Sequence, residues 1–265
     1  MKFSYLALCF SLVASGCGGG GSSPSPSPAP SPAPAPAQPP GGLYIGYYQE
    51  DPINNPENPE PGSFYLYLPD GDADFAGEMS FTYFGCQSSN VGRVSGTKSQ
   101  GALAGDWAGT ADGVPLGGPY SGTYDSAAQR YSGTYTNRGG KVRIVVPDCA
   151  DYHAAAYGTW EMAPVTARSP SDFAITVSGG NVTWTDVAGA TQWLASVYDE
   201  AKARTGGDAV VKQTVLDARS TGSENRSVPL AVLGMEPGRA YVLAITGFSA
   251  SHLRVGYTAL RYTAP

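Results

Sequence analysis

Short stretches in which apolar and polar residues alternate dominate the chain from residue 43 onward. This alternation is typical of half-buried β-strands, and Gly, Pro, Asn and Asp clusters between the stretches are typical of turns. In the first half we predict strands at Leu43–Tyr48, Phe64–Leu68, Met79–Phe84, Tyr120–Tyr124, Tyr131–Tyr135, Val142–Val146 and Ala156–Met162. In the second half we predict them at Phe173–Val177, Asn181–Thr185, Gln192–Tyr198, Val210–Leu216, Tyr241–Phe248 and Val255–Tyr262. The fold class is therefore all-β, with a barrel or sandwich of seven to eight strands followed by a second sandwich.

One internal repeat defines a hairpin in the first half. The sequence YSGTY occurs at Tyr120–Tyr124 and again at Tyr131–Tyr135. Because side chains alternate along a strand, both tyrosines and the glycine between them share one face. We predict that these two strands pair across the turn Asp125–Arg130.

The first residues have the pattern of a targeting segment. Lys2 precedes the apolar run Phe3–Val13, which is too short to span a bilayer, and Ala14–Gly16 with Cys17 follow at once. An apolar run, small residues and a cysteine resemble the lipobox of bacterial lipoproteins, with Ala14 where Leu is usual. The resemblance implies that residues 1–16 are removed and that acyl chains on Cys17 anchor the protein. The alternative is an ordinary secretory signal with an incidental cysteine.

Residues 17–42 read as a spacer between this anchor and the folded part. Glycine and serine come first, and Pro24–Pro40 then alternates proline with serine or alanine for most of its length. Proline lacks a backbone donor and favours extended polyproline II, at about 3.1 Å per residue, so this stretch reaches on the order of 50 Å. Gly18 stands where an inner-membrane retention Asp is found in enteric bacteria, and this resemblance implies the outer membrane, facing the periplasm or the cell surface.

Charge divides the remainder into two parts. Residues 43–163 hold 14 acidic and 6 basic residues and 12 of the 17 tyrosines, whereas residues 164–265 hold 8 acidic and 9 basic residues. This asymmetry predicts two domains with a boundary near residue 164. The net charge of −6 argues against a nucleic-acid partner, since phosphate backbones require clustered Lys and Arg.

The second part resembles a fibronectin type III domain over residues 168–265. Val182–Thr185 looks like its second strand, Gly189–Tyr198 like the approach to its third, and Met235–Tyr241 like its L-x-P-x-x-x-Y turn. The resemblance implies that Trp184 and Trp193 are core residues and that the Tyr241 hydroxyl bonds back to the backbone. The first part is only weakly similar, around the YSGTY repeat, to uncharacterised β-rich lipoproteins of proteobacteria, and this implies no activity.

Two cysteines remain once the signal segment and Cys17 are set aside. Cys86 and Cys149 form an even pair in an oxidising compartment, which predicts a disulfide. The alternative is a cysteine-based metal site, although two Cys without paired His cannot complete a tetrahedral zinc site.

Catalytic motifs are scarce. The two histidines, His153 and His252, fall in different parts, and neither a G-x-S-x-G elbow nor a nucleotide-binding glycine loop occurs. We therefore expect no enzyme and no cofactor. The remaining catalytic alternative is an exported hydrolase that uses His153 with a nearby aspartate such as Asp148 or Asp151.

An acidic run offers a candidate calcium site. Asp70, Asp72 and Asp74 alternate, and Glu78 follows four residues later, so that several carboxylates point to one side. The EF-hand pattern is broken at Phe75, and Pro69–Asp72 also reads as a solvated hairpin turn.

The aromatic residues give the main functional lead. Tyr65 and Tyr67 alternate with Phe64, Leu66 and Leu68, so we expect the two tyrosines to face solvent and to bind a neutral glycan or a protein. The alternative is ordinary cross-strand packing of tyrosine. The sequence thus favours a non-catalytic surface lipoprotein with a binding or architectural role, and a carbohydrate-binding lipoprotein is the second interpretation.

Overall fold

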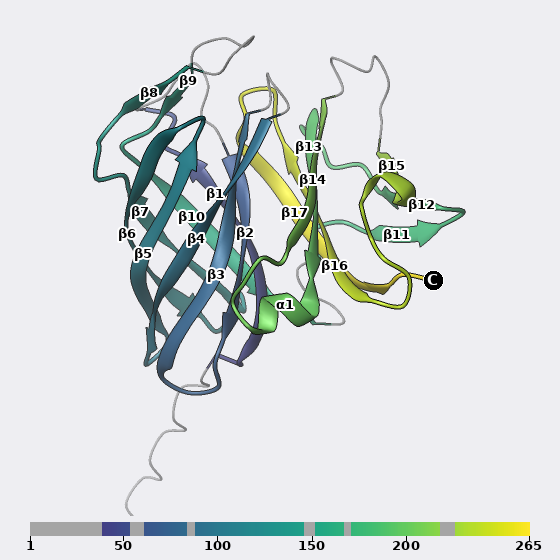
Figure 1. Ribbon diagram of the computed structural model, residues 1–265, viewed down its shortest axis with the longest axis horizontal. Helices are drawn as coiled ribbons and strands as arrows, with labels where there is room; N and C mark the ends of the chain where they lie inside the picture. Colours follow the sequence, from purple (N-terminus) through teal and green to yellow (C-terminus); the bar gives the residue numbers. More distant parts are fainter. Residues whose placement is uncertain (1–38, 54–60, 84–87, 146–151, 167–170, 218–225) are drawn as a thin grey trace, which may run out of the picture. The chain divides into compact units, whose positions relative to one another are not determined.

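The computed structural model describes residues 39–53, 61–83, 88–145, 152–166, 171–217 and 226–265. Nearly all regular structure in these ranges is β, which confirms the predicted fold class (Figure 1). Within the same ranges, no helix has both the length and the apolar character needed to cross a membrane.

Eight antiparallel strands form a closed barrel in the first half of the chain. They are β1 (Gly42–Glu50), β2 (Pro61–Leu68), β3 (Ala73–Tyr83), β4 (Ser88–Ser99), β5 (Ala102–Ala111), β6 (Val114–Asp125), β7 (Arg130–Thr136) and β10 (Tyr157–Pro164). Around the barrel their order is β1-β10-β7-β6-β5-β4-β3-β2, and β1 closes it by pairing with both β10 and β2. The alternation in the sequence did not predict β4 and β5, whose inward positions include Gly96 and Gly105 besides Val94, Leu103 and Trp107.

The repeated YSGTY segments form the predicted hairpin, β6–β7. Tyr120 pairs with Tyr135, Tyr124 with Tyr131, and Gly122 with Gly133. A Cβ atom on Gly122 would lie only 2.3 Å from Cζ2 of Trp160, so the missing side chain makes room for the indole inside the barrel. The ring of Tyr120 then meets that indole edge to face, with centroids 6.0 Å apart.

The barrel interior is packed with aromatic and aliphatic side chains rather than hollow. Its largest members include Tyr44, Phe64, Trp107, Tyr131 and Trp160, each at most 6 % exposed. The cavity that remains among them has a volume of about 40 Å³, well below the ~300 Å³ at which ligand pockets begin. We conclude that the barrel lumen is a core.

Each end of the barrel is covered by its own chain. At one end lies the hairpin of β8 (Val142–Ile144) and β9 (Tyr152–Ala154), with Ile144 fully buried in the barrel core. At the other end the linker enters, where the fully buried Lys98 donates from Nζ to the carbonyl oxygens of Pro39 (3.1 Å) and Pro69 (2.8 Å). Burial lowers the pKa of Lys98, against the nearby charges of Asp70 and Asp72. Residues 39–41 thus belong to the folded part.

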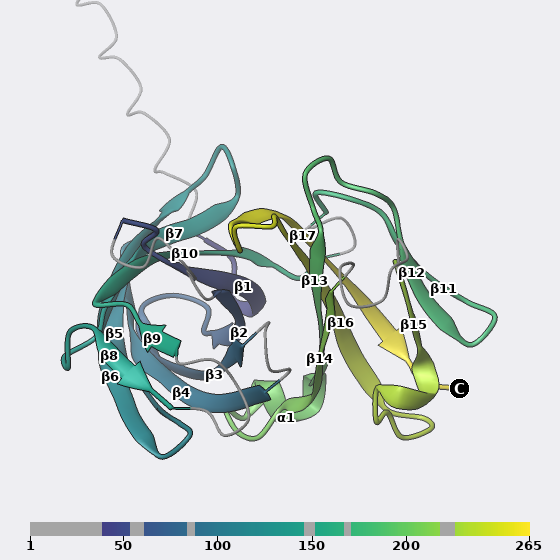
Figure 2. The same cartoon turned by 90° about the horizontal axis from the view of Figure 1, so that it is seen from above.

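The second half of the chain forms a sandwich of two sheets (Figure 2). One sheet holds β11 (Ile175–Ser178), β12 (Asn181–Trp184) and β15 (Ser227–Pro229), and the other holds β14 (Val210–Asp217), β13 (Gln192–Asp199), β16 (Ala240–Phe248) and β17 (Arg254–Thr263). Trp184 and Trp193, from opposite sheets, pack in the core with ring centroids 5.6 Å apart. The Tyr241 hydroxyl accepts a hydrogen bond from the backbone N–H of Glu236 at 2.8 Å.

Two short helical segments complete the sandwich. The helix α1 (Glu200–Arg204) follows β13, and Asp199 caps it by accepting a hydrogen bond from the N–H of Lys202 at 3.1 Å. The 3₁₀ segment η1 (Leu230–Val232) follows β15.

Candidate functional site

The outer wall of the barrel and the β14-β13-β16-β17 sheet bury a shared surface, which we call the seam. Its apolar part joins barrel and sandwich side chains: Leu43, Ile45, Tyr65, Val165, Tyr198, Ala203, Ala209, Val242 and Ala244. Every residue of β13 is buried, because one face lines the sandwich core and the other lines the seam. Burial on both faces of a strand indicates a stable contact rather than a loose tether between the two halves.

A buried carboxylate lies within the seam. Glu78 of β3 is 2 % exposed, and its Oε2 accepts hydrogen bonds from the Tyr65 hydroxyl (2.8 Å) and from the N–H groups of Ala209 (2.8 Å) and Val210 (3.3 Å). A buried charge needs such partners, since desolvation costs several kcal/mol for an unpaired ion. One side chain of the barrel therefore fixes the position of β14 in the sandwich.

The position of Tyr65 corrects one prediction. Its side chain points out of the barrel, as the alternation in β2 predicted, but it is 0 % exposed because the sandwich covers it. Its ring meets that of Tyr198 edge to face, with centroids 5.4 Å apart. The prediction that Tyr65 faces solvent is wrong, because alternation identifies the outward face but not what covers it.

Hydroxyl groups form a second polar contact across the seam. Ser63 Oγ lies 2.7 Å from the Tyr198 hydroxyl and 3.0 Å from Ser196 Oγ, and Gln213 Nε2 donates to Ser63 Oγ at 2.8 Å. Burial raises the pKa of Tyr198 to about 12, although the hydrogen bonds from Ser63, Ser196 and Gln213 oppose the shift. The Tyr198 hydroxyl stays protonated near neutral pH and serves as a hydrogen-bonding group.

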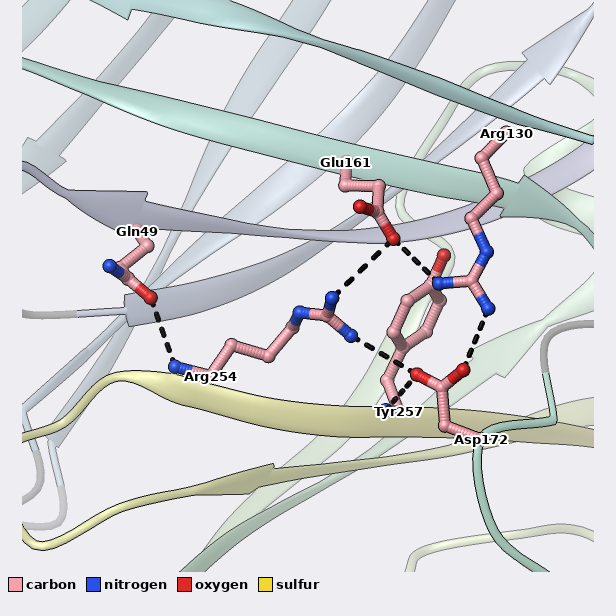
Figure 3. A network of polar contacts seen from close by, with 6 residues as sticks. All are labelled: Gln49, Arg130, Glu161, Asp172, Arg254 and Tyr257. Atoms are coloured by element: carbon pink, nitrogen blue, oxygen red, sulfur yellow. Dashed lines mark hydrogen bonds and ion pairs between the residues drawn. The ribbon is translucent and has the colours of Figure 1, made fainter. Parts of the chain in front are cut away.

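A network of four charged side chains crosses another part of the seam (Figure 3). Arg130 of β7 contacts Glu161 and Asp172, each at 2.7 Å, and Arg254 of β17 contacts Asp172 at 3.1 Å and Glu161 at 3.7 Å. Two positive and two negative groups thus alternate around a ring, and each charge is compensated twice. The arrangement suits a lock between two surfaces better than an acid–base pair, because neither carboxylate is free of a guanidinium.

Aromatic rings and backbone groups complete this network. The Arg254 guanidinium lies 4.3 Å from the ring centroid of Tyr47, and the backbone N–H of Tyr257 donates to Asp172 at 3.0 Å. Burial alone would raise the pKa of Asp172, but the hydrogen bonds from Arg130 and Tyr257 and the charges of Arg130 and Arg254 outweigh it and hold the pKa below its usual value.

Beside the seam lies an open groove of about 240 Å³, which we call the Tyr67 groove. One wall is the outer face of the β2–β3 hairpin, with Tyr67, Pro69, Asp74 and Ala76, and the other is the end of α1, with Arg204, Thr205 and Gly206. Tyr67 and Ala76 are register partners across β2 and β3. Gly206 has φ +73°, and a Cβ there would lie 3.2 Å from that of Ala76, so glycine permits this turn to approach the barrel closely.

Arg204 bridges the two walls of the Tyr67 groove. Its Nη1 donates to the Tyr67 hydroxyl at 3.1 Å, and its guanidinium carbon lies 5.4 Å from the centroid of the Tyr67 ring. Its Nη2 contacts Glu200 at 3.0 Å, and Glu200 also binds Arg261 at 3.1 Å. Of the two tyrosines predicted to bind a ligand, only Tyr67 thus borders an accessible cavity, and Arg204 is a residue of this site that sequence reasoning missed.

The predicted calcium ligands are not brought together. Asp70 Oδ1 accepts from Gly41 N at 3.2 Å, Asp72 from Gln100 N at 2.9 Å and Asp74 from Thr97 Oγ1 at 2.9 Å, while Glu78 lies in the seam. Among the described residues, no group of three or more His, Cys, Asp or Glu side chains is placed to hold a metal ion. The acidic run caps backbone and hydroxyl groups at the barrel end instead, because each carboxylate faces a different partner.

Other predicted residues fall outside the described part of the chain. These are Cys17, Cys86 and Cys149, and the lipidation and the disulfide stay predictions. The backbone of His153 in β9 pairs with that of Arg143 in β8, and its side chain lies outside the described part of the structure, so the hydrolase stays an alternative. The prolines and acidic residues of Asp51–Gly62 also predict a long loop, and its residues 54–60 lie outside the described part of the chain.

Neither family models nor curated proteins match this chain. The site must therefore be interpreted from its own geometry.

Proposed function

We propose that this chain is a non-catalytic lipoprotein of the outer membrane that displays a two-part head on a proline-rich stalk. In this proposal Cys17 carries the lipid, residues 18–38 form the stalk, and the barrel with its fibronectin-like sandwich forms the head. The head binds a ligand at the Tyr67 groove. In this proposal the barrel and the seam hold the head rigid and take no part in a reaction.

The observation that carries the proposal is how the linker joins the barrel. Lys98 holds the carbonyl of Pro39, the Tyr44 hydroxyl donates to the carbonyl of Pro40 at 2.7 Å, and the N–H of Gly41 donates to Asp70 at 3.2 Å. Three consecutive residues are thus fixed at one end of the barrel, directly before β1. The stalk of this proposal therefore leaves the head at one defined point, the end of the barrel, which suits display on a tether.

A binding role rather than a catalytic one is supported by the ionic groups. The carboxylates of the seam, Glu78, Glu161 and Asp172, each bond to the facing half of the protein rather than to a cavity. General acid–base catalysis needs groups within reach of a substrate. The Tyr67 groove offers hydrogen-bonding and charged groups at its surface without such a pair.

The anchor is tested by changing its cysteine in the full chain. Cys17→Ser removes the thiol that would be acylated, so we expect the protein to leave the membrane fraction and the acyl mass to vanish from its N-terminal peptide. Cys9→Ser is the matched control, because Cys9 lies in the segment that would be removed, and it should leave fractionation unchanged. Membrane association that persists in Cys17→Ser, with no acyl mass on the unaltered protein, contradicts the proposal.

A further inference from the structure

The two walls of the Tyr67 groove carry opposite charges that do not pair with each other. Asp74 is exposed on β3 and bonds Thr97, and Arg204 on α1 contacts Tyr67 and Glu200. Among the described residues, no ion pair joins Asp74 to Arg204, although both border the same cavity. Each charge is therefore still available to a ligand in the groove.

Arg204 keeps capacity for an anion. A guanidinium has five N–H donors, and the contacts to Tyr67 and Glu200 engage its two Nη atoms only in part. Glu200 is shared with Arg261, whose Nε lies 3.1 and 3.2 Å from its two carboxylate oxygens. Two guanidinium groups thus share the single negative charge of Glu200, so the positive charge of Arg204 is only partly compensated. A guanidinium group can bind a further carboxylate through two N–H groups.

We propose that the Tyr67 groove binds a small zwitterion, a molecule with one ammonium and one carboxylate group of the free amino acid type. Asp74 receives the ammonium and Arg204 the carboxylate, while Pro69 and Ala76 contact a short apolar part. This inference rests on the proposed binding function and gives it a ligand class. The groove volume of about 240 Å³ is below that of typical ligand pockets, which restricts the ligand to a small molecule.

A neutral sugar fits this groove less well. Sugar rings stack on open aromatic faces, and the Tyr67 face carries the guanidinium of Arg204 at 5.4 Å. A zwitterion does not need that face, because its two charges meet the two walls. The charge pattern therefore favours an amino acid over the glycan that the exposed-tyrosine prediction suggested.

Calorimetric titration of the full mature chain in detergent separates these ligands. The probes are L-leucine, 4-methylpentanoate, which lacks the amine, 3-methylbutylamine, which lacks the carboxylate, and glucose. We expect L-leucine to bind with Kd below about 1 mM and each half-molecule to bind at least about tenfold more weakly. Arg204→Gln and Asp74→Asn should each weaken leucine binding at least about tenfold, the loss of one charge-assisted hydrogen bond.

The control variant is Lys202→Gln, which removes an exposed positive charge from the same helix but not from the groove. It should bind leucine as the unaltered chain does, and thermal melting of all variants checks that the fold is kept. If Arg204→Gln melts at a lower temperature than the unaltered chain, leucine binding by Asp74→Asn alone tests the ligand assignment. Absence of leucine binding, equal binding of the half-molecules, or binding of glucose alone overturns the inference. Because Cys17→Ser fractionation tests the anchor separately, a membrane-bound chain that does not bind leucine contradicts only the ligand assignment.

Discussion

The barrel interior and the seam are both lined with tyrosine, but they use its hydroxyl differently. Inside the barrel, the Tyr48 and Tyr120 hydroxyls reach backbone carbonyls, and the Tyr131 hydroxyl has no hydrogen-bond partner among the described residues. In the seam, the hydroxyls of Tyr65 and Tyr198 bond the side chains of Glu78 and Ser63 from separate elements, although the Tyr257 hydroxyl has no hydrogen-bond partner among the described residues. The barrel is held by shape and ring packing, whereas the seam is held by polar pairs that accept only one orientation of the sandwich.

This difference in hydrogen bonding follows from what holds each region in place. A closed barrel already fixes the register of its strands through the ladder of backbone hydrogen bonds, so its core needs only volume and apolar surface. Two preformed surfaces can slide over each other, and buried polar partners oppose any shifted arrangement because each leaves unpaired groups. We expect the barrel interior to be sensitive to volume and the seam to be sensitive to single polar atoms.

The largest effect should come from adding one methyl group inside the barrel. Gly122→Ala would place a carbon 2.3 Å from Trp160 and 2.4 Å from the carbonyl oxygen of Ser132, so neighbouring strands must shift. We expect a loss of about 3 kcal/mol in the free energy of unfolding, measured by chemical denaturation with tryptophan fluorescence. Gly207→Ala is the control, because its Cβ would meet nothing within 4 Å. Equal stability of the two variants would show that the interior is loosely packed.

The same chemical change at two tyrosines should affect the stability of the two regions differently. Tyr65→Phe removes a hydrogen bond to the buried carboxylate of Glu78, and we expect it to cost about 1.5 kcal/mol. Tyr131→Phe removes a hydroxyl with no partner among the described residues, and we expect a change within about 0.5 kcal/mol. Denaturation curves of both variants measure the difference. A larger loss for Tyr131→Phe than for Tyr65→Phe would reverse our account of the two regions.

The smallest effect should be on the pH dependence of stability, and it should arise from the seam alone. The pKa of Asp172 is lower in the folded protein than in the unfolded chain, so its contribution to stability is present above the unfolded value of about 3.9. That contribution is lost as pH falls through the folded pKa. In Asp172→Asn the slope of stability against pH should decrease in this acidic window, as measured by thermal melting at a series of pH values. An unchanged slope would mean that other carboxylates dominate acid unfolding.

Much of the fold could be predicted from alternation, but two barrel strands could not. The strands rich in tyrosine and valine carry a clear pattern, and the YSGTY repeat predicted the pairing of β6 with β7. In β4 and β5 the inward positions include Gly96 and Gly105. A Cβ on Gly96 would lie 2.7 Å from the Tyr120 hydroxyl, and one on Gly105 would lie 2.6 Å from the Cα of Gly96. Glycine at an inward position interrupts the alternation of apolar and polar residues on which the strand prediction depends.

The candidate site was less predictable because it depends on contacts between distant parts of the chain. Alternation identified Tyr65 and Tyr67 as outward-facing, yet only the tertiary structure shows that the sandwich buries Tyr65 while Tyr67 borders a groove. Likewise, Glu78 looked like part of an acidic run, but its partners Ala209 and Val210 lie more than a hundred residues away. No local sequence pattern predicts a role for Arg204. It belongs to the site because it lies at the end of α1, where it donates a hydrogen bond to Tyr67.

The way in which the barrel closes has a consequence for the order of folding. Strand β1 pairs with its neighbour β2, but its other edge is covered only when β10 arrives, with Tyr44 beside Pro164. Contacts between residues so far apart in sequence form slowly, and an uncovered strand edge can pair with another chain in the meantime. A chain that is synthesised from its N-terminus therefore leaves one edge of β1 unpaired until almost the whole barrel sequence has been made. During this interval, a chaperone that shields the edge of β1 would raise the yield of folded protein more than one that acts on the sandwich.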